Sequence, residues 1–346
     1  MKDHGMTGTE FDVEAILAQR VTQEGRGPVD APSIALWCAA AEDANPRHWA
    51  SVDRPIAPPA MASTWTQSPP WTPSGPPARA MELHHRLKEE VGLPTAVVRE
   101  VSHRYGVPVR VGDRLTATHR IVEVGPIRPS RMGEGRDWSV EVDHRNQHGE
   151  PVALETWAFH GYRLAGPSSS GAAGTGRPGG ALQPVAGTGI TLPELSIDID
   201  ASRIVKAAAA SGDWTRFHHD PVTAAAAGLP DIILNTPGHM ALVTRWITDC
   251  VAPGARLRQL ALRLRRSVVP GDVLRIGGEV VDESVTADGW RQLGLVFTER
   301  VGDKTAATGR ATVVAAASSG AADPWDIPLD RWQTFGDTDD HAADNQ

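Results

Sequence analysis

The last third of the chain alternates apolar and polar residues, which is the pattern of strands with one buried face. From position 260 to 265, leucines at every second position alternate with alanine and arginine. Similar runs follow at 273–281, 292–300 and 306–315. Before them, apolar residues recur at helical spacing up to Val251, in a helix that we expect Thr236 to cap, with Pro237 at its first position. One buried helix followed by an antiparallel sheet predicts an α+β domain.

The first half has the same order of elements, with a more polar helix. The helix is predicted at 80–91, and the strands that follow it are predicted at 97–102, 113–124, 138–146 and 151–162.

The two halves also resemble each other in sequence. The segment from Asp30 to Asp43 aligns without a gap with the segment from Asp200 to Asp213, at an offset of 170 residues. Both opening aspartates are predicted to cap short Ala-rich helices. Further on, a Gly-Asp turn at 112–113 matches another at 271–272, each before a strand. These matches indicate a duplicated domain.

A segment rich in Gly, Ser, Ala and Pro separates the copies and cannot bury a core. We therefore divide the chain into a first domain (10–164), a linker (165–191), a second domain (192–318) and an acidic tail (319–346).

Composition excludes several classes of function. The formal net charge of −8 argues against nucleic acid as a main partner. No apolar run is long enough to span a bilayer, and the first residues lack the apolar core of a secretory signal. Two cysteines, Cys38 and Cys250, are expected to be free thiols in a reducing cytoplasm. The 11 tryptophans, against 5 Phe and 2 Tyr, suggest large apolar cavities.

The candidate chemistry is an Asp with a His five residues later, which occurs in both halves. The two pairs are Asp43 with His48, and Asp213 with His218. One such pair alone is more simply a turn with a surface histidine. Its recurrence after the same capped helix favours a site. A neutral His can accept a proton from water while a carboxylate orients that water. The start of the 236–251 helix offers N–H donors for a developing oxyanion, from Thr236, Gly238 or His239.

These residues also resemble a known family. Ser211-Gly-Asp213, His218-His-Asp-Pro221 and Ala227-Gly-Leu-Pro230 resemble the signature of MaoC-like (R)-specific enoyl-CoA hydratases. The second half, from Asp231 to Asp249, is similar to actinobacterial acyl dehydratases, including subunits that act on steroid side-chain thioesters. The first half, through 57–61 and the Asp-x-Asn-Pro of 43–46, is similar to the FAS1-like dehydratase hotdog paired with them.

The resemblance implies a double hotdog, in which two long helices are each wrapped by an antiparallel sheet. It implies reversible addition of water to a trans-2-enoyl thioester to give an (R)-3-hydroxyacyl product. Asp213 and His218 would hold the water, while the other half shapes the acyl pocket. The family's Asn-Pro is Thr215-Arg216 in the second copy, and its Gly near the helix start is Thr236. Because the first copy keeps Asn45 and His48, it remains an alternative or second site.

Other interpretations remain open. Arg263, Arg265 and Arg266 are candidates for the phosphates of coenzyme A, or equally a solvated strand face. We expect no metal and no cofactor, because adjacent histidines such as His218-His219 chelate poorly. Ser63, Ser211 and Ser267 lack the context of a serine nucleophile. The expected partners are an acyl-CoA or acyl-carrier-protein thioester and a second copy of the chain. The alternatives are a catalytically idle double hotdog that binds thioesters or partners another hydratase subunit, and a hotdog thioesterase.

Overall fold

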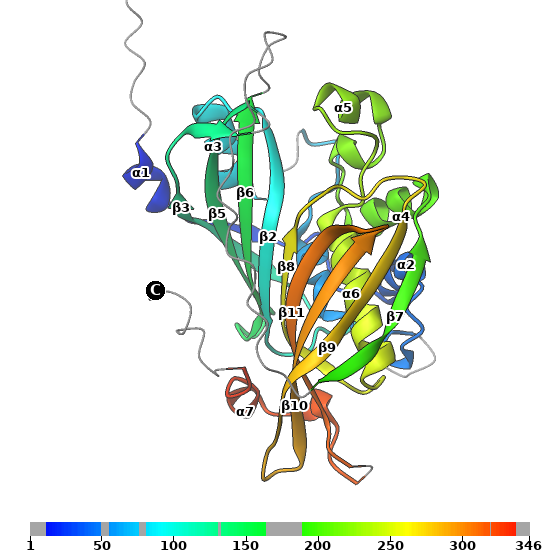
Figure 1. Ribbon diagram of the computed structural model, residues 1–346. Helices are drawn as coiled ribbons and strands as arrows, with labels where there is room; N and C mark the ends of the chain where they lie inside the picture. The colour runs from blue at the N-terminus through cyan, green and yellow to red at the C-terminus, as the bar shows by residue number, and fades with distance from the viewer. Residues whose placement is uncertain are drawn as a thin grey trace, which may run out of the picture.

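The antiparallel sheet that runs through the whole molecule is the main feature of the fold (Figure 1). The structure is a computed structural model that describes residues 12–49, 55–75, 81–130, 133–163, 189–318 and 320–336. Its 11 strands are ordered β1-β3-β5-β6-β2-β8-β11-β10-β9-β7, with β4 paired to β5. Together with the helices this confirms the α+β prediction. No described helix is long and apolar enough to cross a membrane.

The first half contributes the strands at one end of this sheet. Its elements are α1 (Val13–Leu17), β1 (Val21–Glu24), α2 (Ala31–Ala41), η1 (Pro46–His48), η2 (Pro59–Thr66), α3 (Glu82–Glu90), β2 (Thr95–Tyr105), β3 (Thr116–Val124), β4 (Arg128–Ser130), β5 (Gly133–Arg145) and β6 (Pro151–Arg163).

The second half contributes the strands at the other end. Its elements are β7 (Ile190–Asp198), α4 (Ala201–Ser211), η3 (Arg216–His218), α5 (Pro221–Ala226), α6 (Thr236–Cys250), β8 (Arg256–Leu264), β9 (Val273–Val285), β10 (Trp290–Val301), β11 (Lys304–Ala316), η4 (Pro324–Asp326) and α7 (Leu329–Trp332).

The duplication seen in the sequence has a structural counterpart. Asp30 caps α2 by accepting a hydrogen bond from Ser33 N at 2.7 Å, and Asp200 caps α4 by accepting one from Arg203 N at 2.6 Å. Both N-cap predictions are therefore confirmed. The matching Gly-Asp turns agree as well, since Gly112 and its counterpart at 271 have φ of 96° and 91°.

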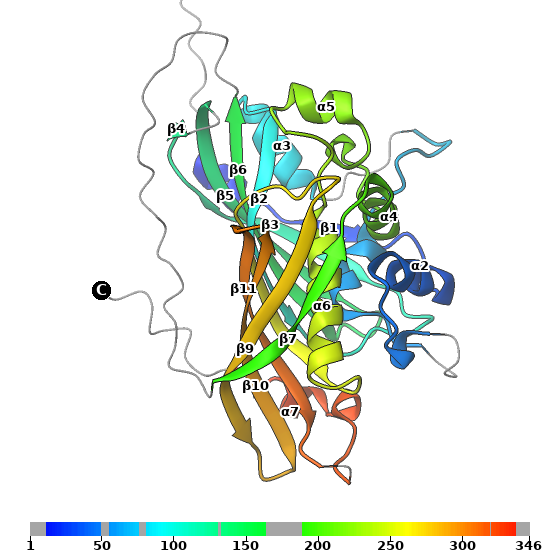
Figure 2. The same cartoon turned by 45° about the vertical axis from the view of Figure 1, so that its right-hand side comes forward.

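The two halves join edge to edge through strands β2 and β8. His103 faces Leu260 and Glu100 faces Arg263 across this antiparallel seam. Helices α2, α4 and α6 lie together on one side of the sheet (Figure 2). Glu42, at the end of α2, accepts hydrogen bonds from Arg203 at 2.6 Å and Arg245 at 3.4 Å, which ties the helices of the two halves together. The halves thus form one packed body.

Helix α6 is the buried helix predicted for the second half, but its cap differs from the prediction. Asn235 is the N-cap, with Oδ1 accepting from Gly238 N at 3.0 Å, and Thr236 is the first helical residue. Asn is as good a cap as Thr, and here its side chain is buried and points at the helix start. Trp246 of α6 packs against Phe297 of β10.

Among its described residues, the first half does not contain the second long helix that the resemblance implied. Its place in the sequence holds η2, of eight residues, and α3, of nine. Prolines at 58, 59, 69, 70 and 73 lie in this stretch, and a helix interior cannot accommodate a residue without an N–H. The first half therefore leaves room beside its sheet.

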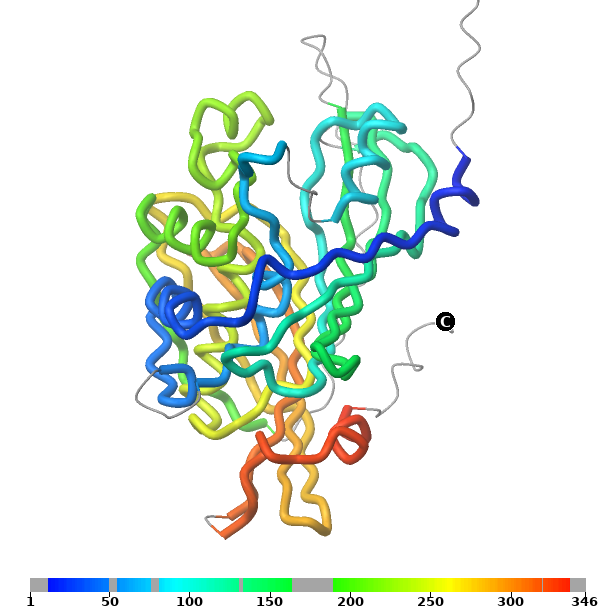
Figure 3. Tube along the Cα trace, turned by 180° about the vertical axis from the view of Figure 1, so that it is seen from behind, coloured from blue at the N-terminus to red at the C-terminus, as the bar shows by residue number. Residues whose placement is uncertain are grey.

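The ends of the predicted domains also differ from the structure. Strand β7 begins at Ile190, inside the segment assigned to the linker, while the rest of that linker lies outside the described residues. Part of the predicted acidic tail is folded, since Trp325 and Trp332 are 4% and 0% exposed. This C-terminal segment lies at the end of the molecule remote from α5 (Figure 3). Both cysteines are free, as predicted.

Candidate active site

A cavity of about 770 Å³ lies between the two halves. The second half lines it with polar residues from α4, η3 and the start of α6, namely Ser211, Asp213, Thr215, His218, Asn235, Thr236 and His239. The first half lines it from η2, α3 and its sheet, with Ser63, His84, His103, His119, His144, Glu155 and Trp157 among the contributors. Of the 11 tryptophans only Trp157 lines it, so the cavity does not explain the tryptophan content.

Asp213 and His218 meet at this cavity, as the sequence predicted. Asp213 follows α4 and His218 ends η3, and His218 Nε2 lies 3.2 Å from Asp213 Oδ2. His218 Nδ1 lies 2.7 Å from the carbonyl oxygen of Ile233, which accepts the Nδ1 proton. Its Nε2 is therefore left to face the carboxylate and the cavity.

The pair shifts the pKa values of both members. Burial alone would raise the pKa of Asp213, but the hydrogen bond and charge of His218, with the bonds from Thr215, outweigh it and hold the pKa at about 2. Burial likewise disfavours the charged form of His218, and the carboxylate of Asp213 outweighs this, so that the pKa of His218 is raised. Asp213 is thus ionised at neutral pH, and His218 titrates closer to neutrality than an isolated histidine.

The replacement of the family's Asn-Pro by Thr215-Arg216 leaves the local turn intact. Thr215 N donates to Asp213 Oδ1 at 3.2 Å, just as Asn45 N donates to Asp43 Oδ1 at 2.9 Å in the first copy. The bond uses the backbone N–H, which either residue provides. Arg216 points away to form an ion pair with Asp220. The departure in sequence is therefore not a departure in geometry.

Asn235 connects Asp213 to the buried helix α6. Its Nδ2 donates to Ser211 Oγ at 2.9 Å and to Asp213 Oδ2 at 3.2 Å, while its Oδ1 caps α6. Asn235 is 1% exposed. Its position 22 residues after Asp213 carries no sign of this contact in the sequence. Ser211 thus serves as a hydrogen-bonding partner within the site.

Two of the three N–H groups proposed for the oxyanion are already used within the helix. Gly238 N donates to the Asn235 side chain, and His239 N donates to the Asn235 carbonyl at 3.1 Å. The N–H of Thr236, at the first helical position and on the cavity wall, has no recorded partner among the described residues. Of the three candidates Thr236 is therefore the best placed.

His239 has a role that the sequence did not reveal. Its Nδ1 lies 2.6 Å from Oε2 of Glu299 on β10, and the two side chains are 2% and 0% exposed. His239 also lines the cavity, so its contact with Glu299 fixes the orientation of an imidazole ring on the cavity wall. A buried charge of this kind is retained only when it is paired.

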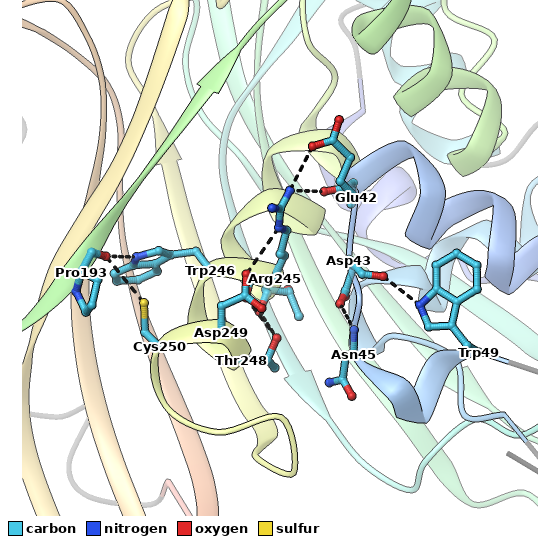
Figure 4. Close-up of polar contacts among 12 residues, drawn as sticks. Glu42, Asp43, Asn45, Trp49, Pro193, Arg245, Trp246, Thr248, Asp249 and Cys250 are labelled. Atoms are coloured by element: carbon cyan, nitrogen blue, oxygen red, sulfur yellow. Dashed lines mark hydrogen bonds and ion pairs between the residues drawn. The ribbon is translucent and has the colours of Figure 1, made fainter. Parts of the chain in front are cut away.

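The corresponding residues of the first half lie elsewhere. Asp43, Asn45 and His48 are all buried, and none of them lines the cavity. His48 packs edge-on against Trp325, with ring centroids 6.2 Å apart. Figure 4 shows Asp43 and Asn45 in a turn beside Trp49, whose Nε1 donates to the Asp43 carbonyl at 2.9 Å. Burial lowers the pKa of His48. The geometry thus makes this alternative site part of the core.

The three arginines suggested for coenzyme A are separated by the structure. Arg263 is paired with Glu100 across the seam at 3.1 Å and does not line the cavity. Arg265 and Arg266 do line it, and Arg265 is exposed. Arg266 lies 3.9 Å from Asp272. Arg265 and Arg266 therefore lie at the cavity, Arg266 next to Asp272, whereas Arg263 serves the junction of the halves.

Comparison with known proteins identifies the family. The model of the MaoC like domain matches residues 187–295, and that of the FAS1-like dehydratase domain region matches residues 17–155. The beta subunit of 3-oxo-4,17-pregnadiene-20-carboxyl-CoA hydratase from Mycobacterium tuberculosis is 34% identical over 120 residues, which cover 35% of this chain and 91% of the relative. The chain belongs to the MaoC-like family of enoyl-CoA hydratases and dehydratases.

A second relative extends the likeness. The probable enoyl-CoA hydratase alpha subunit of Thermomonospora curvata is 26% identical over 172 residues, covering 46% of this chain and 54% of the relative. The chain thus spans about half the length of that relative.

Solved structures agree with the fold. A MaoC-like dehydratase has a TM-score of 0.66 at 21% identity, covering 88% of this chain and 99% of its own. A conserved hypothetical protein of Mycobacterium tuberculosis, described as a double hotdog, has a TM-score of 0.56 at 12% identity, covering 86% and 95%. The predicted double hotdog fold is therefore confirmed.

Proposed function

We propose that the protein adds water reversibly to a trans-2-enoyl-CoA and forms an (R)-3-hydroxyacyl-CoA. The observation that carries this proposal is the contact between Asp213 and His218 on the wall of the cavity between the two halves. A hydratase needs an acceptor for the proton of water and a fixed carboxylate to orient it. The (R) configuration is the one implied by the family.

The residues divide the reaction between them. A water molecule in the cavity, beside the pair, directs its two hydrogens at Asp213 Oδ2 and His218 Nε2. Its oxygen adds to C3 of the enoyl group as His218 takes one proton, and the electron pair of the double bond moves toward the thioester oxygen. The N–H of Thr236, at the positive end of the α6 dipole, stabilises that oxygen. His218 then returns the proton to C2, and water has been added without net consumption of acid or base.

The acyl group is proposed to extend into the first half. The cavity continues from Asp213 to residues of the first-half sheet, such as Trp157 and Phe159, where none of the described helices is as long as α6. This supports a bulky acyl group, in keeping with the steroid thioester in the name of the Mycobacterium tuberculosis relative. Arg265 and Arg266 are proposed to meet the phosphates of coenzyme A.

The chain is also proposed to form a homodimer. The relatives named above are subunits of larger hydratases. Light scattering is expected to give twice the chain mass of 36.9 kDa, and a mass of one chain under dilute conditions would count against the dimer.

The test is hydration of a panel of trans-2-enoyl-CoAs with short, long and steroid-like acyl groups, followed by loss of the enoyl absorbance. Asp213→Asn and His218→Ala are expected to lower the rate by ~10²–10⁴-fold. Asp43→Asn and His48→Ala are matched controls, because they change the same residue types outside the cavity. Both control variants, when folded, are expected to hydrate enoyl-CoA at the wild-type rate.

Other results would redirect the assignment. Loss of activity with His48→Ala alone, in protein that remains folded, would move the chemistry to the first half. Release of coenzyme A from a saturated acyl-CoA would instead identify a thioesterase. A wild-type protein that binds acyl-CoA and hydrates none of the panel would be an idle binding subunit.

A further inference from the structure

The first-half wall of the cavity carries a cluster of three histidines and one glutamate. His119, His144, Glu155 and His103 lie on β3, β5, β6 and β2, which are four successive neighbours in the sheet. His103 is directly opposite Glu155 in the β2–β6 pairing. All four line the same cavity as Asp213. We call this group the histidine cluster.

The histidine cluster is buried yet largely without partners. The side chains of His103, His119, His144 and Glu155 are only 1–3% exposed. None of the six ring nitrogens has a hydrogen-bond partner in the described protein, and neither has Glu155 Oε1. The nearest approaches to Oε1 are 3.4 Å from His144 Nε2 and 3.7 Å from His103 Nδ1.

Other buried histidines of this chain do not share this feature. His84 Nδ1 accepts a hydrogen bond from Trp138 at 3.1 Å, and His48 Nδ1 bonds the Ile56 carbonyl at 2.6 Å. Burying a polar group without a hydrogen-bond partner destabilises the folded protein. Several such groups on one cavity wall therefore point to a ligand that pairs with them.

The charges of the histidine cluster restrict what that ligand can be. Glu155 Oε2 accepts from Ser63 Oγ at 2.5 Å and Trp157 Nε1 at 2.9 Å. Burial alone would raise the pKa of Glu155, but the interactions with His103 and His144 and the hydrogen bond from Ser63 lower it, so it is ionised. Burial lowers the pKa of His103, and lowers that of His119 to about 4, so these rings are neutral at pH 7.

A neutral imidazole offers one N–H donor and one acceptor nitrogen, and Glu155 Oε1 adds a charged acceptor. A methyl group would satisfy none of these atoms, and a carboxylate would face the charge of Glu155. A carbonyl accepts only and would leave Oε1 without a donor. A hydroxyl group both donates and accepts, so it can pair with Oε1 and with a histidine N–H together. No group of three or more His, Cys, Asp or Glu among the described residues is placed to hold a metal ion.

We propose that the histidine cluster is a subsite for a hydroxyl group carried on the acyl part of the substrate, away from the thioester. This deepens the proposed function and rests on it. The enzyme would then select acyl thioesters that are already hydroxylated, so a hydroxylating or ketone-reducing reaction must supply its substrate.

The test measures binding rather than turnover. Isothermal titration of the full chain would use saturated acyl-CoAs of increasing length, each with a terminal methyl, hydroxyl, ketone or carboxylate group. Saturated thioesters cannot be hydrated, so affinity is read alone. At the length that reaches the histidine cluster, the hydroxyl ligand is expected to bind ~10–100-fold more tightly than the methyl ligand.

Substitutions test whether the preference for the hydroxyl ligand arises at the histidine cluster. His119→Leu and Glu155→Gln are expected to bring the affinities of hydroxyl and methyl ligands within about twofold of each other. His48→Leu also replaces a buried histidine, but outside the cavity, and is expected to keep the preference. The wild-type panel is decisive even if one variant fails to fold.

Several results would overturn the proposal. Equal or tighter binding of the methyl ligand at every length would do so, as would a preference for the ketone or carboxylate. Zinc binding by wild type that is lost in Glu155→Gln would identify a metal site instead. Hydration of enoyl-CoAs with no hydroxyl preference would defeat this inference alone, whereas failure of every acyl-CoA to bind would defeat the proposed function too.

Discussion

His218 Nδ1 lies 2.7 Å from the carbonyl oxygen of Ile233, and this bond turns the opposite ring nitrogen toward Asp213. In the first half, His48 Nδ1 makes the same contact with the carbonyl oxygen of Ile56. Duplication has therefore kept the orientation of the histidine in both copies. The copies differ in what surrounds the ring, which is a cavity in the second half and Trp325 in the first.

The ionisation of His218 predicts an acid limb in the pH profile of hydration. His218 must be neutral to accept a proton, and its pKa is raised above 6.5. We expect kcat/KM to fall as pH decreases through that raised pKa. In Asp213→Asn the supporting charge is lost while burial remains, so the residual activity should have its acid limb at lower pH. The measurement is kcat/KM from pH 5 to 9 for both proteins. An acid limb at the same pH in both would show that Asp213 does not set this pKa.

Asn235 is expected to affect stability and catalysis together. Asn235→Ala removes the cap of α6, at a cost of about 1 kcal/mol in the free energy of unfolding, and also the bond to Asp213. We expect kcat to fall by ~10-fold or more. Asp30→Ala is the matched control, since it removes an N-cap of α2 away from the site and should cost stability alone. Denaturant unfolding and hydration kinetics check both. Equal kcat in the two variants would confine Asn235 to a structural role.

Much of the fold could be predicted because its determinants are local. The period-two runs marked all four strands after α6, and the caps at Asp30 and Asp200 marked two helices. The helix predicted from the polar pattern at 80–91 is present as α3, whereas the long first-half helix implied by the resemblance is not found among the described residues. The folded C-terminal segment was missed because its four buried large apolar residues, at 325, 327, 332 and 335, are scattered and show no period.

Only the part of the candidate site that lies in a single turn of the chain could be predicted. Asp213 and His218 are five residues apart, so their spacing carried the information. Asn235 and the histidine cluster reach the cavity from other elements, and Glu299 contacts His239 from β10. His103, His119 and His144 each occupy one position of an alternating strand, and nothing in one strand reveals its neighbours. Their meeting is a property of the sheet order.

The C-terminal segment is expected to hold the two halves together. Trp332 Nε1 donates to the Tyr105 carbonyl at the end of β2, at 2.6 Å, and the Arg256 guanidinium of β8 lies 3.7 Å from the centre of the Trp332 ring. Trp332→Ala should lower the free energy of unfolding by about 3–5 kcal/mol. Trp71→Ala is the control, since that ring is 72% exposed. Denaturant unfolding of both variants is the measurement, and similar small losses would contradict the assignment.

The buried histidines predict that the protein loses stability on mild acidification. The pKa of His119 is about 4 in the folded chain, against about 6.5 when unfolded. Between these values the unfolded chain binds a proton that the folded chain does not, so the free energy of unfolding falls as pH falls. From pH 7.5 to 5 this group alone contributes a loss of about 2 kcal/mol.

His119→Leu and His119→Gln both remove the titrating ring, whatever their effect on overall stability. Both should therefore lose about 2 kcal/mol less than the wild type over the same pH range. Free energies of unfolding from urea titrations at pH 7.5, 6 and 5 provide the measurement. If either variant kept the wild-type pH dependence, the pKa of His119 would be the same in the folded and the unfolded chain. The ring would then be protonated in the folded protein at pH 5, and the hydroxyl subsite would have a neutral wall at this position only at higher pH.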